Sequence, residues 1–179
     1  HETYPGQLNV AFTRGYVSSQ SFVDFYQSKG SISRLLPAKA AQGLKFKPDH
    51  PLAEEALIWM GFEARHAILS LLEDAVLDQT ARVCMIAYDL NEPRIVDCLE
   101  KLGERLRIII DDDAGHGLAT SAESEAEKRL SALKCSVKRQ HMGKLQHNKI
   151  IVVDGEKVKK AVCGSTNFSW RGLYVQSNN

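Results

Sequence analysis

Apolar residues recur along this chain with two different spacings, which follow one another in a regular order. A period near 3.6 residues predicts helices and short β-branched runs predict strands, because these repeats match the two kinds of backbone. The predicted elements are one helix or two within 51–79, a strand at 81–88, a helix at 93–102, a strand at 106–110, a helix at 121–134 and a strand at 136–139.

The last part of the chain predicts a β-hairpin. Two β-like runs, 150–153 and 158–163, are separated by a short turn that begins at Asp154-Gly155. Strands that alternate with helices are typical of an α/β fold with right-handed crossovers. We therefore predict a mixed, largely parallel β-sheet that includes the hairpin and is flanked by helices on both faces.

Residues 1–50 are the least regular part of the sequence. A strand is predicted at 8–13 and a short helix at 21–26, and Gly30, Pro37 and Gly43 interrupt the remainder of the segment. We expect this irregular segment to pack on a single domain formed by 51–179.

Composition and charge say little about the class of protein or its substrate. At 179 residues, 44% apolar and 25% charged, the chain is ordinary for one globular domain with a buried core. Its formal net charge of +1 gives no overall basic field that would point to nucleic acid. Within 131–179, however, nine Lys or Arg face two acidic residues, whereas 91–130 has ten acidic and six basic residues. The C-terminal part is locally positive and would attract an anionic substrate.

The four cysteines form no CxxC pair, and three lie in predicted apolar strands or helices. We expect buried free thiols, which favour a reducing, cytoplasmic compartment. No uncharged apolar run reaches about 18 residues, so no membrane-spanning segment is predicted.

Two polar stretches admit more than one interpretation. The aspartates at 111–113 close a predicted strand and could bind a cation. Three consecutive side chains do not converge easily on one ion, so a solvated strand end is favoured. His116 lies between two glycines, and we expect it to be mobile and exposed.

The hairpin carries the clearest chemistry. His147 and Lys149 are two residues apart, so on a strand both side chains project from the same face. The second run leads into the GSTN sequence at 164–167, which the hairpin returns to the neighbourhood of that pair. An imidazole, an ammonium, a hydroxyl and a carboxamide would then surround a backbone that Gly164 leaves unobstructed.

This set of groups suits a phosphate. Lys149 supplies a point charge for the non-bridging oxygens, and Ser165 and Asn167 supply neutral donors. His147 can act as a nucleophile or as a general acid or base near neutral pH. Taken alone, each piece could be a solvated strand edge or an ordinary turn, but the combination at this spacing argues against that interpretation.

The combination resembles the HxK(x)4D(x)nGSxN signature of the phospholipase D superfamily. The matching residues are His147, Lys149, Asp154, Gly164, Ser165 and Asn167. The resemblance implies a phosphodiesterase that works through a covalent phosphohistidine and needs no metal or other cofactor. In that family two copies of the motif build one site, and the histidine of one copy attacks phosphorus while the other protonates the leaving group.

The resemblance also implies a role for each matching residue. His147 is nucleophile or general acid and base, and Lys149 and Asn167 hold the phosphoryl oxygens. Ser165 assists them, and Asp154 belongs to the catalytic motif by orienting its neighbours.

Gly164 and Arg171 are expected to support the anion site. Trp170 either packs under the hairpin or lines the substrate groove.

This chain carries one copy of the motif. The second half would come from the remaining part of a longer tandem protein or from an identical chain in a twofold dimer. We favour the tandem protein, because the family leads us to expect a further strand and a closing helix after Asn179.

The predicted function is hydrolysis or transfer of a phosphodiester, with a phospholipid as the favoured substrate. A metal-independent endonuclease is an alternative with the same chemistry. The balanced charge and the lack of interleaved aromatic and basic residues weaken that alternative, whereas the basic C-terminal region supports it. An alternative of another class is an inactive module that binds anions or pairs with another half.

Overall fold

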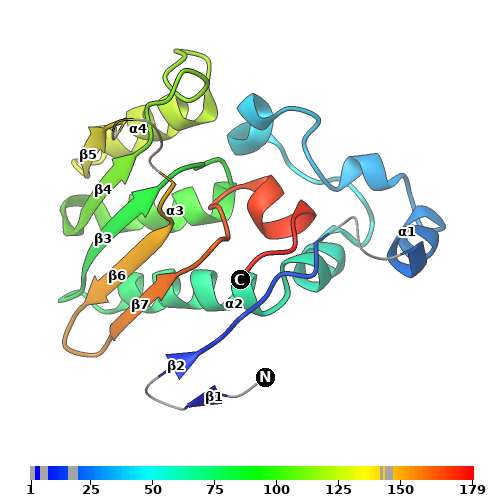
Figure 1. Cartoon of the computed structure of the whole chain (residues 1–179), viewed down its shortest axis with the longest axis horizontal. Helices are drawn as coiled ribbons and strands as arrows, with labels where there is room; N and C mark the ends of the chain where they lie inside the picture. The colour runs from blue at the N-terminus through cyan, green and yellow to red at the C-terminus, as the bar shows by residue number, and fades with distance from the viewer. Residues whose placement is uncertain (1–2, 5–7, 16–19, 142, 144–146) are drawn as a thin grey trace.

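The protein is built on a five-stranded sheet (Figure 1), seen in a computed structural model that describes residues 3–4, 8–15, 20–141, 143 and 147–179. The strands, in the spatial order β5-β4-β3-β6-β7, are β3 (Arg82–Ala87), β4 (Leu106–Ile110), β5 (Ser136–Arg139), β6 (Ile150–Asp154) and β7 (Lys159–Cys163). β3, β4 and β5 pair in parallel, whereas β6 is antiparallel to both of its neighbours. The predicted mixed α/β fold and the hairpin are confirmed.

The helices agree with the sequence pattern to within a few residues. They are α1 (Gln20–Gln27), α2 (Ala53–Leu77), α3 (Pro93–Leu102) and α4 (Ala122–Ala132), with the 3-10 turns η1 (Ile32–Arg34), η2 (Ala40–Lys45) and η3 (Gly103–Arg105) and the π-helical turn η4 (Arg171–Val175). Capping explains where two of them begin. The Glu92 side chain accepts from the N–H of Ile95 at the start of α3, and Ser121 accepts from the N–H of Ser124 at the start of α4.

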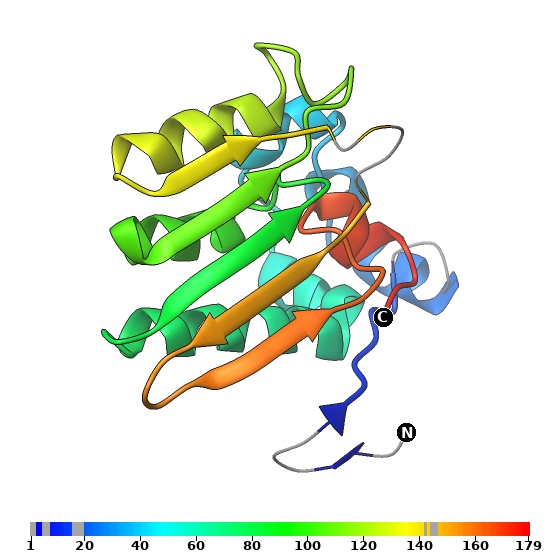
Figure 2. The same ribbon diagram turned by 60° about the vertical axis from the view of Figure 1, so that its left-hand side comes forward.

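The described helices cover one face of the sheet and leave the other open, as Figure 2 shows. In β3, Val83 and Met85 are buried against the helices, while the alternate residues Arg82, Cys84 and Ile86 are exposed or half-buried. The predicted mixed, largely parallel sheet is confirmed, since four of the five strands run in one direction, whereas the described helices lie on one face rather than on both. Ile86, Ile109 and Val152 lie on the open face, which made these strands look apolar throughout.

α2 is interrupted at Phe62, where φ is 44° and ψ is −131°. The N-terminal segment bonds the backbone groups that the break releases. The N–H of Arg14 donates to the carbonyl of Met60 at 2.8 Å, and the N–H of Ala64 donates to the carbonyl of Phe12 at 3.1 Å. Because unpaired buried backbone groups are costly, this exchange explains how the helix continues past the break.

The N-terminal segment shares the core of the sheet. Its apolar contributions to that core are Phe22, Tyr26, Leu35 and Leu44. The strand predicted at 8–13 is limited to β2 (Leu8–Asn9), which pairs with β1 (Thr3–Tyr4). The sequence also predicts a connecting turn at 141–145, which lies partly outside the described residues.

All four cysteines are free. Cys98 and Cys135 are buried as predicted, but Cys84 and Cys163 are exposed on the open face of the sheet. Among the described helices, none has the length and apolar character that crossing a membrane requires.

Asp78, just after α2, closes the turn of the β6–β7 hairpin. One carboxylate oxygen accepts from the N–H groups of Lys157 (2.8 Å) and Val158 (3.2 Å), and the other accepts from Thr80. The hydrogen bonds, that of Thr80 foremost, lower the pKa of Asp78 to about 2, although burial acts against this change.

We predict that Asp78→Asn lowers the Tm near neutral pH. The folded pKa of Asp78 lies below its usual value, so the carboxylate stabilises the fold fully above about pH 4 and loses this effect as the pH falls towards about 2. The Tm difference from wild type should therefore shrink in acid. Asp154→Asn, an exposed aspartate of the same hairpin, is the control and should change the Tm little. Equal Tm values for Asp78→Asn and wild type at neutral pH would contradict this account.

Candidate active site

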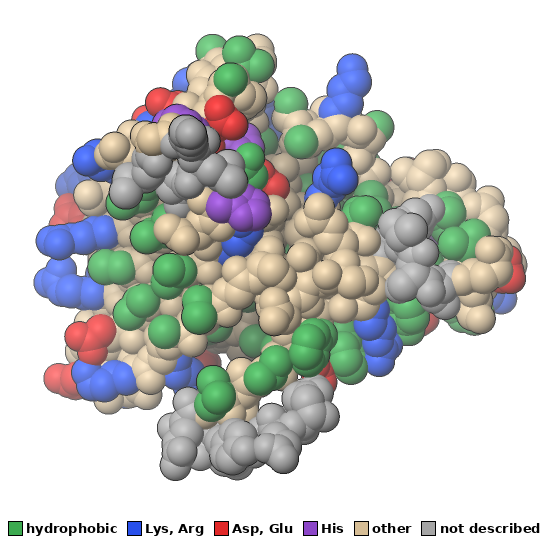
Figure 3. Space-filling view, viewed as in Figure 1, with side chains coloured by type: hydrophobic (Ala, Val, Ile, Leu, Met, Phe, Trp, Pro, Cys, Tyr) green, Lys and Arg blue, Asp and Glu red, His purple; other side chains and the backbone are tan. Residues whose placement is uncertain are grey.

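All five strands have one terminus at the same end of the sheet, which we call the site edge. β3, β4, β5 and β7 run in one direction and end at this edge, whereas β6 runs the other way and begins there. The edge therefore holds Tyr88 and Asp89 after β3, Asp111 after β4, His141 after β5, His147 and Lys149 before β6, and 164–167 after β7. Figure 3 shows histidine side chains gathered in one patch with acidic and basic side chains beside them. Ligand sites of α/β folds commonly lie at such an edge.

His147 and Lys149 converge on the aromatic ring of Tyr88. The imidazole centroid of His147 lies 4.8 Å from the ring centroid of Tyr88, with an interplanar angle of 69°. The Nζ atom of Lys149 lies 5.1 Å from the same centroid. The structure thus brings the predicted pair together, although β6 begins only at Ile150 and both residues precede it.

The ammonium of Lys149 is buried, whereas His147 is exposed. Nζ donates a hydrogen bond to the carbonyl oxygen of His147 at 2.6 Å. Burial lowers the pKa of Lys149, and the negative charge of Asp89 opposes this change. In the part of the chain that the structure describes, no carboxylate bonds directly to this ammonium. A buried cation without such a partner is well suited to an anionic ligand.

Asn167 is buried at the same edge, and its carboxamide oxygen has no hydrogen-bond partner among the described residues. The chain after it is joined to the end of β3. The carbonyl of Phe168 accepts from the N–H groups of Asn91 (3.2 Å) and Glu92 (3.3 Å), and the Asn91 side chain accepts from the N–H of Trp170 (3.0 Å). These bonds join the residues that directly follow the GSTN turn to Asn91 and Glu92, a few residues after Tyr88.

The π-helical turn η4 packs directly on Asn167. A Cβ atom at Gly172 would collide with the carbonyl oxygen and Cβ of Asn167, so only glycine permits this approach. Tyr174 anchors the turn because its hydroxyl donates to Glu92 (3.1 Å) and accepts from Nε of Arg65 (3.2 Å). Turns of this rare kind are frequent at functional sites.

Gly164 and Ser165 face the last residues of the sequence. The hydroxyl of Ser165 bonds to Oδ1 of Asn179 at 2.9 Å, and its N–H donates to the Asn179 carbonyl at 2.8 Å. A Cβ atom at Gly164 would collide with that carbonyl. Ser165 therefore reaches the edge, but it makes no hydrogen bond to the His–Lys pair of the motif.

Asp154 lies apart from the other residues of the motif. It ends β6, about 13 Å of strand away from Ile150 at the usual rise per residue. Its exposed carboxylate pairs with Lys159 in the hairpin. This position gives Asp154 no contact with the His–Lys pair and favours a supporting role in the hairpin.

A pocket of about 470 Å³ opens beside the site. Its lining includes Asp89, His116, Glu123, Trp170 and Arg171. Trp170 is buried and its indole N–H donates to the carbonyl of Gly43 at 3.0 Å, so it packs in the core and also borders the pocket. Arg171 is exposed at the start of η4, where it can meet an anion.

His116 is held between two carboxylates, which corrects the expectation of a mobile side chain. Its Nε2 lies 3.0 Å from Asp89 and its Nδ1 lies 2.8 Å from Asp111. The hydrogen bond to Asp89, followed by that to Asp111, raises the pKa of His116 to about 9, although burial opposes this rise. Arg139 fixes the loop by donating to the carbonyls of Asp111 (2.9 Å) and His116 (2.7 Å).

Asp111 is fully buried rather than part of a solvated strand end. Burial alone would raise the pKa of Asp111, but hydrogen bonds from the Asp113 N–H, His116 and His141 outweigh it and lower the pKa. The one carboxylate thus joins two histidines at the site edge.

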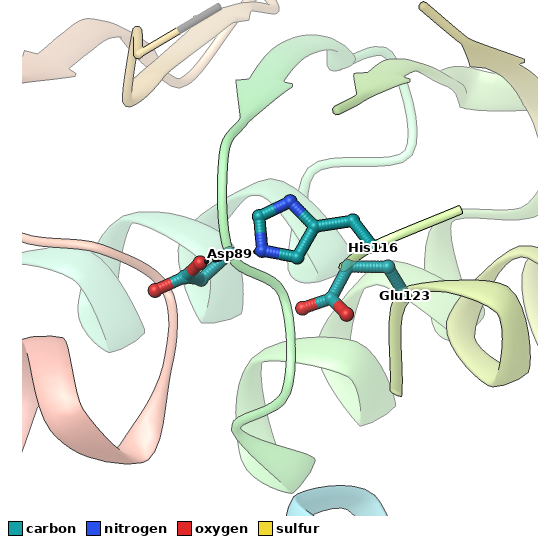
Figure 4. A group of neighbouring side chains, drawn as sticks. All are labelled: Asp89, His116 and Glu123. Carbon is teal, nitrogen blue, oxygen red and sulfur yellow. Dashed lines mark ion pairs between the residues drawn. The ribbon is translucent and has the colours of Figure 1, made fainter. Parts of the chain in front are cut away.

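Asp89, His116 and Glu123 are the described residues that could hold a metal ion. Their ligand atoms lie within 4.8 Å of one another, and Figure 4 shows the imidazole between the two carboxylates. Because carboxylates already occupy both ring nitrogens, a cation would have to displace a proton from His116. Glu123 is buried and accepts from the N–H of Leu90 at 3.1 Å.

Reasoning from the sequence missed Tyr88, Asp89 and the role of His116. The available signal was position, since polar residues follow two neighbouring predicted strands directly and the ends of such strands meet at one edge. The contact between His116 and Asp89 had no sequence signal, because a loop conformation creates it.

The comparisons with known proteins agree with this fold. A family model described as "Cardiolipin synthase, PLD-like domain" matches residues 68–179. Among solved structures, a phospholipase D family member, Nuc from Salmonella typhimurium, has a TM-score of 0.53 at 24% identity, over 65% of this chain and 72% of that chain. Polyphosphate kinase from Porphyromonas gingivalis has a TM-score of 0.49 at 13% identity, over 62% of this chain and 20% of that chain. None of the curated proteins compared with the chain matches it.

The mixed sheet with its helices defines a phospholipase D-like fold, which the likeness to Nuc supports. The family model covers more than half of the sequence and includes the whole His–Lys and GSTN region. The chain belongs to the PLD-like domain family, within the phospholipase D superfamily.

We predict that His116 is an imidazolium at neutral pH. Its folded pKa of about 9 exceeds the usual 6.5, so its charge stabilises the fold fully below about pH 6.5, and this contribution is lost as the pH rises through about 9. A histidine NMR titration should show this pKa, and Asp89→Asn should lower it. His141, which meets Asp111 at 3.5 Å, is the comparison residue in the same spectra. A His116 titration midpoint near the usual value would contradict the hydrogen bonds from its ring to Asp89 and Asp111.

Proposed function

We propose that this chain supplies one half of the active site of a phosphodiesterase that works through a covalent phosphohistidine. His147 is the nucleophile or the general acid and base, and Lys149 and Asn167 bind the phosphoryl oxygens. In the first step a histidine nitrogen forms a bond to phosphorus while the alkoxide leaves with a proton from the second histidine. Water, activated by that second histidine, then breaks the phosphorus–nitrogen bond.

The observation that carries this proposal is the meeting of an exposed imidazole and a buried ammonium on one aromatic ring. Lys149 lacks a direct carboxylate partner among the described residues. The NH2 group of Asn167 can donate to a phosphoryl oxygen, whereas its carboxamide oxygen, which has no partner among the described residues, can only accept from a donor such as a ligand hydroxyl. Such groups cost free energy when buried unless a ligand uses them. A phosphoryl group beside Lys149 would offset this cost with charge-assisted hydrogen bonds.

The favoured substrate is a phospholipid, or a related diester. The site lies in the locally basic C-terminal part, but the chain as a whole has a net charge of only +1. Tight binding to a nucleic acid backbone draws on many basic contacts. Cleavage of DNA or RNA is therefore an outcome to be tested.

A second motif must complete the site, supplied by a further part of the same protein or by a second copy of this chain. The proposed mechanism needs two histidines, and the sequence contains one HxK motif. Molar mass in solution, measured alongside specific activity over a range of concentrations, separates the two sources. A second copy gives activity that rises with dimer content, whereas a tandem protein is active as a monomer.

His147→Ala should lower kcat for diester hydrolysis by about 10²–10⁴-fold in the protein with both halves, because it removes the nucleophile or the general acid and base. Lys149→Met should raise KM and lower kcat. Lys138→Met is the matched control, because this lysine lies on the open sheet face of β5. Asp154→Ala should keep activity within about threefold, since Asp154 stands at the far end of β6. Unchanged hydrolysis by His147→Ala would mean that this half only binds anions or pairs with another half, and that the chemistry resides elsewhere.

Lipid and DNA hydrolysis can be compared in the presence of EDTA, which removes divalent cations. We expect release of the headgroup from phosphatidylcholine vesicles to continue with excess EDTA, because the proposed chemistry uses only side chains. Plasmid DNA under the same conditions is the comparison, with His147→Ala as the blank for both. Faster cleavage of DNA than of lipid would reassign the substrate to nucleic acid. Loss of both activities in EDTA would point to a cation at Asp89, His116 and Glu123.

A further inference from the structure

Three groups of the site edge meet on Tyr88. This residue follows β3, the strand that pairs with both β4 and β6. Its ring lies 4.8 Å from the His147 ring, 4.7 Å from the His116 ring and 5.1 Å from Nζ of Lys149. We propose that Tyr88 is a positioning residue whose ring fixes the imidazole of His147 relative to the ammonium of Lys149. This inference rests on the proposed function of that pair.

His147 needs such a restraint because of its place in the chain. It precedes β6, so the ladder of the sheet does not hold its backbone, and its side chain is exposed. An exposed imidazole samples several rotamers, whereas either in-line attack on phosphorus or proton transfer to the leaving oxygen requires one particular orientation. The edge-to-face contact with Tyr88, at 69°, favours a single ring orientation.

The same ring stabilises the ammonium of Lys149. Nζ lies over the electron-rich face of Tyr88, and a cation–π contact is stronger when the cation is buried. Burial lowers the pKa of Lys149, so a contact that favours the charged form keeps the residue useful for binding phosphate. One ring therefore serves both members of the pair.

His116 supports the ring of Tyr88 through a second edge-to-face contact. The two rings meet at 76°, and carboxylates on both nitrogens of His116 prevent its imidazole from turning. The charged groups that face His116 are Asp89, Asp111 and Glu123. Its carbonyl accepts from the Arg139 guanidinium and from the hydroxyls of Ser121 and Ser124. His116 thus holds the Tyr88 ring in place, and the Tyr88 ring is in turn a rigid neighbour for His147.

The hydroxyl of Tyr88 is not needed for this role. Burial, followed by the charge of Asp89, raises the pKa of Tyr88, so the phenol keeps its proton near neutral pH and cannot act as a base. Phenylalanine preserves the ring and its three contacts with His147, His116 and Lys149. Leucine removes them at similar hydrophobicity, so the two substitutions separate a role of the ring from a role of the hydroxyl.

The test compares Tyr88→Phe and Tyr88→Leu in the protein with both halves, with bis(p-nitrophenyl) phosphate as substrate. Tyr88→Leu should lower kcat by roughly 10- to 100-fold, the usual scale for misplaced catalytic groups, with a smaller change in KM. Tyr88→Phe should stay within about twofold of wild type. Tyr26→Leu is the matched control, because this buried tyrosine lies in α1 and should lower the Tm without lowering kcat.

The outcomes separate the two proposals. If His147→Ala hydrolyses the diester normally, the proposed function fails, whatever Tyr88 does. If His147→Ala is inactive while Tyr88→Leu keeps its kcat, or while Tyr88→Phe is as damaged as Tyr88→Leu, the positioning role is overturned and the function stands. Should Tyr88→Leu not fold, His116→Gln replaces it. Because His116→Gln removes the contact that supports the Tyr88 ring, it should lower kcat about fivefold or more. An unchanged kcat in His116→Gln would refute the inference.

Discussion

The site depends on the direction of β6. This strand runs against β3 and β7, so its start lies where its neighbours end. A parallel β6 would carry His147 and Lys149 to the opposite edge, away from Tyr88 and the GSTN turn. The antiparallel hairpin is therefore the constraint that allows one short stretch of sequence to contribute to the site twice.

Two buried charges lie at this edge of the sheet, and each is stabilised by neighbouring side chains. Lys149 is a cation buried under an aromatic ring, while Asp111 is an anion buried between two histidines. A charge taken out of water is stable only when other groups replace its hydration. The ring of Tyr88 provides that replacement for Lys149, and His116 and His141 provide it for Asp111.

The open face of the sheet is the other consequence of the architecture. Isoleucine, valine and cysteine side chains of β3, β4, β6 and β7 lie there without a covering helix among the described residues. The helix-covered face holds the core, and the packing of α2, α3 and η4 on that side positions Glu92, Tyr174 and thereby Asn167. The site edge is thus supported from one side of the sheet.

The sequence by itself determined the elements and the family. Periodicity located α1 to α4 and β3 to β7 to within a few residues, because local backbone preference and burial follow the same repeats. The spacing of His147, Lys149 and the GSTN turn identified the site-bearing hairpin.

The tertiary structure decided which residues join that hairpin and which leave it. Asp154 belongs to the motif in sequence, but the length of β6 carries it to the other edge. Tyr88, Asp89 and His116 enter the site from other strands and loops, and the bonds between His116 and its two carboxylates exist only after the chain has folded. Spacing along a chain defines neighbours within an element, whereas strand order and loop conformation define neighbours between elements.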